Sequence, residues 1–310
     1  MNVMVSGATG FLGNALCSVL ESQGHQIIKV NTKSADLRYS VSLNQFSDIQ
    51  FDYIYHLAAW TQAGDFCLHH AGEQWILNQQ INTNMLAWWQ KNQAQAKLIC
   101  IGTSCSYAPD YPLSEDNYLE GTPIDSLYTY AMTKRMMLVG LKALSTQFGL
   151  RYLCLVPSTL YGPGYHTDDR QMHFIFDLIR KIIRGKQHGE PVELWGDGTQ
   201  RRELVYVEDF VRLTLSLAQK VDNDVINIGA GEEFEIKEFA RMICEIVDYD
   251  PEEIIYNTSR YVGARSKCLE IDKLKLYCED LRLTPLQTGL RNTIDWFLSK
   301  DTLFMEGQCK

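Results

Sequence analysis

The sequence predicts an α/β fold in which a doubly wound parallel sheet is followed by a smaller C-terminal α/β lobe. Short apolar runs typical of strands alternate with longer helical patterns through the first half of the chain. A glycine-rich turn follows the first of these runs, and the regular alternation ends after Pro157. We therefore expect a first domain over residues 1–160 and a lobe formed mainly by residues 161–310, with some later segments returning to the first domain.

The individual elements follow from apolar runs and their punctuation. In the first domain we expect strands at residues 1–6, 26–30, 53–57, 97–101 and 151–156, and helices at residues 14–22, 75–95 and 126–148. In the lobe we expect helices at residues 174–184, 236–248 and 288–298, and strands at residues 192–195 and 225–228. Clusters of proline, glycine and charge at residues 163–169 and 185–191 separate the elements of the lobe.

Composition narrows the class of protein. A chain of 310 residues that is 45% hydrophobic can bury a large core. The net charge of −9, without a block of lysine or arginine, argues against a nucleic-acid or anionic membrane partner. No run approaches the roughly 18 apolar residues of a membrane span. The nine cysteines show no zinc spacing, so we expect no metal site, reduced thiols and a cytoplasmic location.

The glycine turn predicts a dinucleotide site. Gly7, Gly10 and Gly13 lie between the first strand and the first helix. Glycines allow close approach of the backbone, and the N–H groups at a helix N-terminus face an anion. A Rossmann-type domain is therefore expected. The second strand ends in Val30-Asn31-Thr32-Lys33-Ser34, which lacks the carboxylate typical of NAD sites, and Lys33 suits a 2′-phosphate. NADP(H) is favoured, with NAD(H) as the alternative.

A second pattern predicts acid catalysis beside the cofactor. Tyr130 and Lys134 are one helical turn apart and share a helix face. We expect the Lys134 ammonium to lower the pKa of Tyr130, which is about 10 for a free tyrosine. Thr103 follows the strand at residues 97–101 and supplies a hydroxyl for a substrate carbonyl. The set predicts hydride transfer to or from a carbon bearing oxygen.

These motifs together resemble the extended short-chain dehydrogenase/reductase family of nucleotide-sugar enzymes, over nearly the whole chain. The markers are Gly7 to Gly13, His56-Leu57-Ala58-Ala59, Asn78, Thr103, Tyr130 with Lys134, Leu160-Tyr161-Gly162-Pro163, Trp195-Gly196-Asp197-Gly198, Arg202-Glu203 and Val207-Glu208-Asp209. The pattern is closest to the GDP-fucose synthases. That resemblance implies C3 and C5 epimerisation of a GDP-linked 4-keto-6-deoxy sugar, followed by reduction of C4 with NADPH.

The same resemblance gives Cys105 and His173 the role of the epimerising pair. A thiol and an imidazole have ordinary pKa values of about 8.5 and 6.5, which suit proton transfer near neutrality. Cys105 lies two residues after Thr103, so on a strand the two side chains share a face. The alternative is that Cys105 is a small buried hydrophobe and His173 a surface residue.

The resemblance extends both binding sites. The implied cofactor contacts are Gly7, Thr9, Gly10, Phe11, Leu12, Gly13, Asn31, Lys33, Asp36, Leu37, Leu57, Ala58, Ala59, Asn78, Tyr130, Lys134 and Pro157. The implied substrate contacts are Trp60, Ser104, Thr159, His173, Lys181, Trp195 and Arg202. Lys181, Arg201 and Arg202 are the candidates for the substrate's phosphates, with surface ion pairing as the alternative for the arginines.

Departures from the family pattern bear on the substrate. Related dehydratases carry Asp-Glu where Ser104-Cys105 stands, which argues against 4,6-dehydration. Thr159 lies near the place where the family often has asparagine, and the segment beginning at Trp60 replaces a glycine-rich one. Both changes leave the sugar open.

The sequence is compatible with three functions. The first is the epimerase/reductase. The second is a single-step 4-ketoreductase, 4-epimerase or dehydrogenase acting on a nucleotide sugar, and the third is a non-catalytic nucleotide sensor. We also expect a homodimer in which helices 75–95 and 126–148 pair with their symmetry mates, through Met85, Trp88, Met136 and Leu144.

Overall fold

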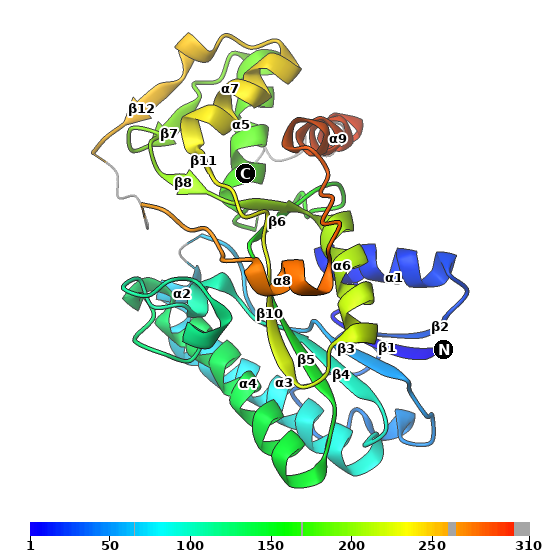
Figure 1. Cartoon of the computed structure of the whole chain (residues 1–310). Coiled ribbons are helices and arrows are strands. Elements are labelled where there is room, and N and C mark those ends of the chain that lie inside the picture. Colours follow the sequence, from blue (N-terminus) through cyan, green and yellow to red (C-terminus); the bar gives the residue numbers. More distant parts are fainter. Residues whose placement is uncertain (65, 169, 260–264, 301–310) are drawn as a thin grey trace.

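The computed structural model describes residues 1–64, 66–168, 170–259 and 265–300 (Figure 1). Its centre is a six-stranded sheet in the order β10-β5-β4-β3-β1-β2, and every neighbouring pair is parallel. The strands are β1 (Asn2–Ser6), β2 (Gln26–Val30), β3 (Tyr53–His56), β4 (Lys97–Ile101), β5 (Tyr152–Pro157) and β10 (Asp224–Ile228). The predicted fold class is confirmed.

Helices cover both faces of this sheet (Figure 1). Helices α1 (Phe11–Ser22) and α6 (Val207–Lys220) pack together on one face, and α3 (Ala71–Asn92) and α4 (Tyr128–Phe148) on the other. The buried Lys97 of β4 joins the sheet to the end of α6. Its Nζ donates to the Ala218 carbonyl at 2.7 Å and pairs with Asp222 at 2.8 Å. The last carbonyls of α6 thereby gain a cationic donor.

Two segments of the second half belong to the first domain. The strand expected at residues 225–228 was assigned to the C-terminal lobe, and that assignment is wrong, because β10 pairs with β5 in the main sheet. Its side chains are almost fully buried there, as expected of an apolar strand beside a covered parallel sheet. Helix α6 was not predicted at all.

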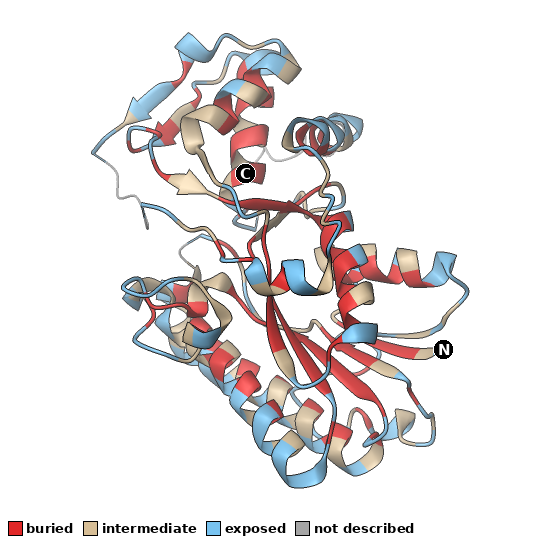
Figure 2. Cartoon of the chain, viewed as in Figure 1, coloured by how far each residue is buried: buried red, intermediate tan, exposed pale blue. Residues whose placement is uncertain are grey.

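A second hydrophobic core lies in the lobe (Figure 2). The lobe's helices are α5 (Phe174–His188), α7 (Ile236–Val247) and α9 (Leu286–Ser299). Three two-stranded pairs accompany them: β7 (Glu193–Trp195) with β12 (Ile255–Asn257), β8 (Arg201–Arg202) with β11 (Phe234–Glu235), and β6 (Thr159–Tyr161) with β9 (Leu204–Tyr206). Among the described residues there are also two short α-helices, α2 (Phe66–His69) and α8 (Asp272–Tyr277).

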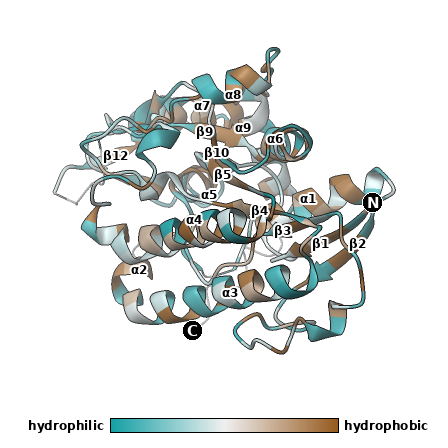
Figure 3. Ribbon diagram, turned by 60° about the horizontal axis from the view of Figure 1, so that its bottom comes forward, coloured by the Kyte–Doolittle hydropathy of each residue, from teal (hydrophilic) through white to brown (hydrophobic). Residues whose placement is uncertain are grey.

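The outer face of helices α3 and α4 carries several exposed apolar side chains among polar ones, and Figure 3 colours both helices by hydropathy. Met85 and Trp88 were expected on this face, and that expectation is wrong, because both are buried in the core beside the sheet. Leu144 is half-buried and packs against the same core. Met136 is exposed as expected, and the other exposed apolar side chains of the two helices include Trp75, Ile76, Tyr128 and Val139.

Within the described ranges, no helix is long and apolar enough to cross a bilayer. The cysteines that fall in those ranges carry free thiols.

Candidate active site

The turn between β1 and α1 is closed so tightly that glycine is required at two positions. Gly7 has a φ of 69°, and a Cβ there would lie 2.9 Å from the Ala58 nitrogen. A Cβ on Gly13 would lie 2.2 Å from the Gly7 carbonyl oxygen. Gly10 caps α1 without any side-chain acceptor for the first N–H groups of the helix. An extended anion such as a dinucleotide pyrophosphate fits this turn.

The end of β3 is held against the glycine turn by buried polar groups. The Asn78 side chain accepts from the Trp60 N–H at 2.9 Å and donates to the Trp60 carbonyl at 3.0 Å. The Ser6 hydroxyl accepts from the Ala58 N–H at 3.3 Å. The predicted contacts Leu57, Ala58 and Ala59 therefore lie beside Gly7, and Asn78 fixes their loop.

The end of β2 is a compact turn with positive charge. Asn31 Oδ1 accepts from the Lys33 and Ser34 N–H groups at 2.9 and 3.1 Å. Asp36 pairs with Arg38 at 2.5 Å, and the Arg38 hydrogen bonds lower the pKa of Asp36. The sequence analysis missed Arg38, the second cation of this turn. Leu37 is buried, and its carbonyl accepts from an α3 asparagine.

Thr103, Tyr130 and Lys134 come together at the carboxyl end of β4. Thr103 caps a short 3-10 turn, Ser104–Ser106, and its hydroxyl accepts from the Cys105 N–H at 3.2 Å. The Thr103 side chain also lies close enough to the Tyr130 hydroxyl to act downward on the pKa of Tyr130, against the larger upward effect of burial. Lys134 Nζ donates to the Ile101 carbonyl at 2.9 Å and lies 5.9 Å from the centre of the Tyr130 ring.

The expected effect of Lys134 on Tyr130 is wrong in this structure. Burial raises the pKa of Tyr130 well above its ordinary value, and Cys105 and Cys67 raise it further. Burial also lowers the pKa of Lys134. Desolvation of the phenolate therefore decides the shift, so Tyr130 keeps its proton at neutral pH and can donate it.

Cys105 lies in the 3-10 turn, so the expected strand geometry with Thr103 is wrong. Its Sγ nevertheless has a cationic neighbour, because Lys267 Nζ lies 3.0 Å away. Burial acts to raise the pKa of Cys105, but Lys267, Thr103 and Arg202 together lower it below its usual value. The local environment therefore favours the thiolate.

His173 caps the N-terminus of α5. Its side chain reaches solvent, yet enough protein surrounds it that desolvation lowers the pKa of the imidazole, and Lys267 and His166 lower it further. Lys267 thus acts on both members of the proposed epimerising pair. The sequence analysis missed Lys267, which lies 162 residues from Cys105 and belongs to no recognised motif.

The three cations that are candidates for binding the substrate's phosphates have different partners. Lys181 pairs with Asp177 at 2.9 Å and donates to the Glu193 carbonyl at 3.2 Å. Arg201 is bound by Glu233 at 3.0 Å. Arg202 donates to the Arg201 carbonyl and is close enough to Cys105 to lower its pKa. Arg202 is therefore the candidate that lies at the active turn.

The remaining predicted site residues lie at the ends of strands, in turns or in the first turn of a helix. Thr9 lies in the glycine turn, Phe11 and Leu12 in the first turn of α1, Ser104 in the 3-10 turn, Pro157 at the end of β5, Thr159 at the start of β6, and Trp195, which is exposed, at the end of β7. The Phe11 ring packs edge-on against Tyr165 and Phe176, which connects the glycine turn to the lobe.

Trp60 borders an open pocket. Its ring contacts Phe66 and His70, with ring centres 4.8 and 5.9 Å away. These two side chains line a cavity of about 540 Å³ together with Gln62, His69, Asp168, Arg170 and Gln171. Trp60 itself is not among the residues that line this pocket, and its expected role in substrate selection stays a prediction.

Arg135, which the sequence analysis also missed, holds the active turn in place. It is buried and donates to the Ser106 carbonyl, with Nε at 3.0 Å and Nη2 at 2.5 Å. It also donates to the carbonyls of Leu119, Glu120 and Gly121 at 3.2, 2.6 and 2.7 Å. One side chain of α4 thus fixes the turn that carries Cys105 and the loop packed behind it.

Comparison with known proteins gives coherent matches. The model of the NAD dependent epimerase/dehydratase family matches residues 3–229. The GDP-L-colitose synthase of Yersinia pseudotuberculosis is 26% identical over 308 residues, and the match covers 97% of this chain and 99% of the other. The GDP-L-fucose synthase of Dictyostelium discoideum is 28% identical over 308 residues, covering 96% and 95%. A GDP-L-fucose synthetase from Naegleria fowleri, solved bound to NADP, has the same fold, with a TM-score of 0.87 at 23% identity, covering 97% and 93%.

Proposed function

Because the chain belongs to the NAD dependent epimerase/dehydratase family, we propose that it is an NADPH-dependent epimerase/4-ketoreductase acting on a GDP-linked 4-keto-6-deoxy sugar. The observation that carries the proposal is the convergence of Thr103, Tyr130 and Lys134 with Cys105 at the end of β4. This set combines a proton donor for a ketone with a second acid–base group beside it.

The reductase half needs a held ketone and a proton. NADPH, when bound, supplies the hydride for the carbonyl carbon. Thr103 is close enough to Tyr130 to act on its pKa, and each hydroxyl can donate to the oxygen of a ketone bound beside it. Tyr130 gives its proton to that oxygen, because burial keeps the phenol protonated. Lys134, fixed to the Ile101 carbonyl, stabilises the phenolate that remains.

The epimerase half needs two proton-transfer groups. Removal of a proton from a carbon beside the ketone leaves its electron pair as an enolate, and a proton returned from the opposite face inverts the centre. Cys105 and His173 are assigned to these two transfers. Cys105 has a cationic neighbour suited to a base, because Lys267 Nζ lies 3.0 Å from its Sγ.

The choice of nucleotide and cofactor rests on separate support. Two of the relatives above are named GDP-L-colitose synthase and GDP-L-fucose synthase, which supports a GDP-linked sugar. Arg202 is assigned to the diphosphate because it is the candidate cation beside the active turn. Lys33 and Arg38 are assigned to the 2′-phosphate of NADP(H), and Gly7, Gly10 and Gly13 to its pyrophosphate.

The assembly and location belong to the same proposal. The exposed apolar side chains of α3 and α4 would be covered by a symmetry mate in a homodimer. The free thiols favour a reducing compartment such as the cytoplasm.

The test is a substrate panel. Purified protein is incubated with GDP-, UDP-, dTDP- and CDP-linked 4-keto-6-deoxy sugars, with NADPH or NADH. Loss of the reduced-cofactor absorbance gives the rate, and NMR identifies the product. We expect the GDP sugar with NADPH to react fastest. Absence of turnover with every nucleotide, or a clear preference for another one, would contradict the proposal.

A single-step 4-ketoreductase is the second candidate. It is favoured by the fact that Thr103, Tyr130 and Lys134 form a complete reductase set without any contribution from Cys105. This candidate predicts a reduced product that keeps the configuration of the substrate beside the ketone. The same hydroxyl and ammonium set argues against a non-catalytic sensor.

A further inference from the structure

We propose that Lys267 is the positioning residue that prepares Cys105 for proton transfer, by holding an ammonium group against the sulfur. The inference rests on the proposed epimerase function and adds to it a residue outside the recognised motifs. The carrying observation is the distance of 3.0 Å between Lys267 Nζ and Cys105 Sγ. At this distance a charge-assisted hydrogen bond to a thiolate is formed.

The surroundings of Cys105 make this contact effective. The sulfur is half-buried and is also influenced by Thr103 in its own turn and by Arg202 of β8. The acidic groups within reach are the weakly ionising Tyr130 of α4 and Cys67 of α2. The closest charged partner of the sulfur is therefore a cation, and its effect on the pKa of Cys105 is downward.

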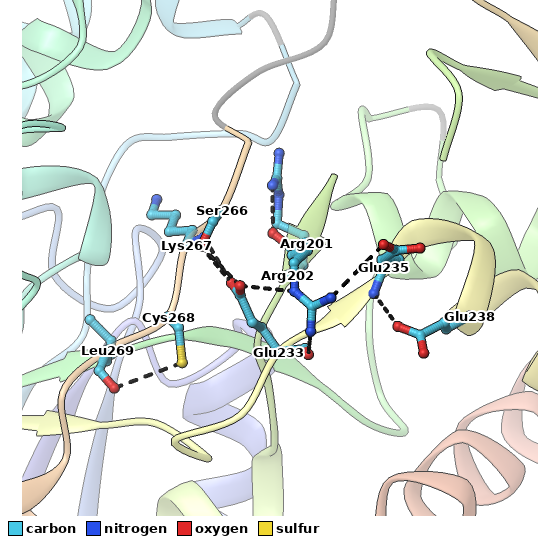
Figure 4. Close-up of polar contacts among 9 residues, drawn as sticks. All are labelled: Arg201, Arg202, Glu233, Glu235, Glu238, Ser266, Lys267, Cys268 and Leu269. Atoms are coloured by element: carbon cyan, nitrogen blue, oxygen red, sulfur yellow. Dashed lines mark hydrogen bonds and ion pairs between the residues drawn. The ribbon is translucent and has the colours of Figure 1, made fainter. Parts of the chain in front are cut away.

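Lys267 is held in place through its backbone (Figure 4). Its N–H donates to a Glu233 carboxylate oxygen at 3.2 Å, and the preceding Ser266 hydroxyl donates to both oxygens of the same carboxylate at 2.9 and 2.8 Å. Arg201 binds Glu233 from the other side at 3.0 Å. Figure 4 shows the Lys267 side chain pointing away from Glu233, so the carboxylate anchors the backbone and leaves the ammonium for Cys105.

The segment that carries Lys267 is tied to both parts of the molecule. On the lobe side, the Arg201 N–H donates to the Arg265 carbonyl at 2.8 Å. The Leu269 N–H donates to Glu203, which lies between β8 and β9, at 3.0 Å. On the side of the first domain, the Glu270 N–H donates to the Leu113 carbonyl at 3.1 Å. A backbone fixed at both ends limits the freedom of Lys267 and lowers the entropy lost when its side chain binds the sulfur.

The chemical consequence is specific to the epimerase half. A larger thiolate fraction makes Cys105 a better base for the carbon-bound proton, which moves to Sγ while its electron pair becomes the enolate. In the part of the chain that the structure describes, Lys267 makes no hydrogen bond with Thr103, Tyr130 or Lys134, so ketone reduction is affected less.

The direct test is the pH dependence of Cys105 alkylation. Wild-type protein, Lys267→Met and Lys267→Arg are treated with iodoacetamide across a pH series, and the peptide containing Cys105 is quantified by mass spectrometry. Lys237→Met is the matched control, because Lys237 pairs with Glu235 in the lobe and makes no contact with Cys105. Unfolding by urea confirms that each variant is folded.

We expect Lys267→Met to move the midpoint of alkylation up by about one pH unit or more, which is about a tenfold slower reaction near neutrality. Lys267→Arg should retain most of the wild-type profile, and Lys237→Met all of it. An unchanged midpoint in folded Lys267→Met overturns the proposal. A different measurement would contradict the proposed function, namely the absence of turnover or of deuterium uptake in the wild type. The two outcomes can therefore be distinguished.

Discussion

At the scale of single residues, the proposed ketone reduction requires Tyr130 to be a proton donor rather than a phenolate. We expect Tyr130→Phe to lower turnover by about 10²- to 10⁴-fold, because the ring is kept and only the proton-donating hydroxyl is lost. Binding of NADPH, followed by fluorescence titration, should change little. Tyr128→Phe is the matched control, since Tyr128 lies two residues earlier in the same helix and is exposed. Wild-type turnover in Tyr130→Phe would refute the assignment.

The residues that sequence alone identifies are those joined by local spacing. Tyr130 and Lys134 are one helical turn apart, and Thr103 closely follows an apolar strand, so their convergence was predictable. The direction of the Tyr130 pKa shift was not predictable, because it depends on how deeply the folded protein buries the phenol. Lys267 reaches Cys105 across 162 residues, and no periodicity links the two positions.

At the scale of elements, Arg135 is the residue through which α4 fixes the active turn. We expect Arg135→Met to lower the free energy of unfolding by about 3 kcal/mol or more, because several charge-assisted hydrogen bonds are lost and buried carbonyls are left without donors. Urea unfolding measures this change. Arg151→Met is the matched control, because the Arg151 side chain is exposed and donates to the Gln95 carbonyl rather than to the active turn. Equal loss in both variants would contradict this role.

The strands of the main sheet were predicted within one or two residues because their apolar runs are short and sharply bounded. Helix α6 was missed because its first residues, Val207-Glu208-Asp209, were interpreted as a family motif rather than as a helix start with acidic residues in the first turn. Cys105 was placed on a strand because the strand was extended past Ile101, whereas Thr103 caps a 3-10 turn there. A hydroxyl cap of this kind is a local signal that the sequence does carry.

At the scale of the whole molecule, we expect a homodimer formed by α3 and α4. Ile76→Lys with Met136→Lys should convert the dimer to a monomer, because both side chains are exposed and would place charge in an apolar interface. Light scattering at micromolar concentration measures the mass. Leu276→Lys is the control, since Leu276 is exposed on α8, away from this face. A monomeric mass for the wild type would contradict the expected assembly.

The arrangement of the two parts was only partly predictable from sequence. The loss of regular strand–helix alternation after Pro157 indicates a second hydrophobic core. It does not show that β10 and α6 return to the first domain. The strand order depends on which apolar strand pairs with a free edge of the sheet, and β10 pairs with β5 at one edge. The burial of Met85 and Trp88 depends on which face of α3 packs against the sheet. The sequence does not determine this orientation, because apolar residues occur on both faces of α3.

The central claim, that one site both epimerises and reduces, is tested most directly by running the reaction in heavy water with the accepted sugar nucleotide and NADPH. NMR of the product then locates deuterium at the carbons flanking the former ketone. We predict deuterium at those carbons for the wild type, and its strong suppression in Cys105→Ser, whose hydroxyl has a pKa far above neutrality while Thr103, Tyr130 and Lys134 are unchanged. Wild-type product that carries no solvent deuterium at those carbons would contradict the epimerase half and leave a single-step ketoreductase.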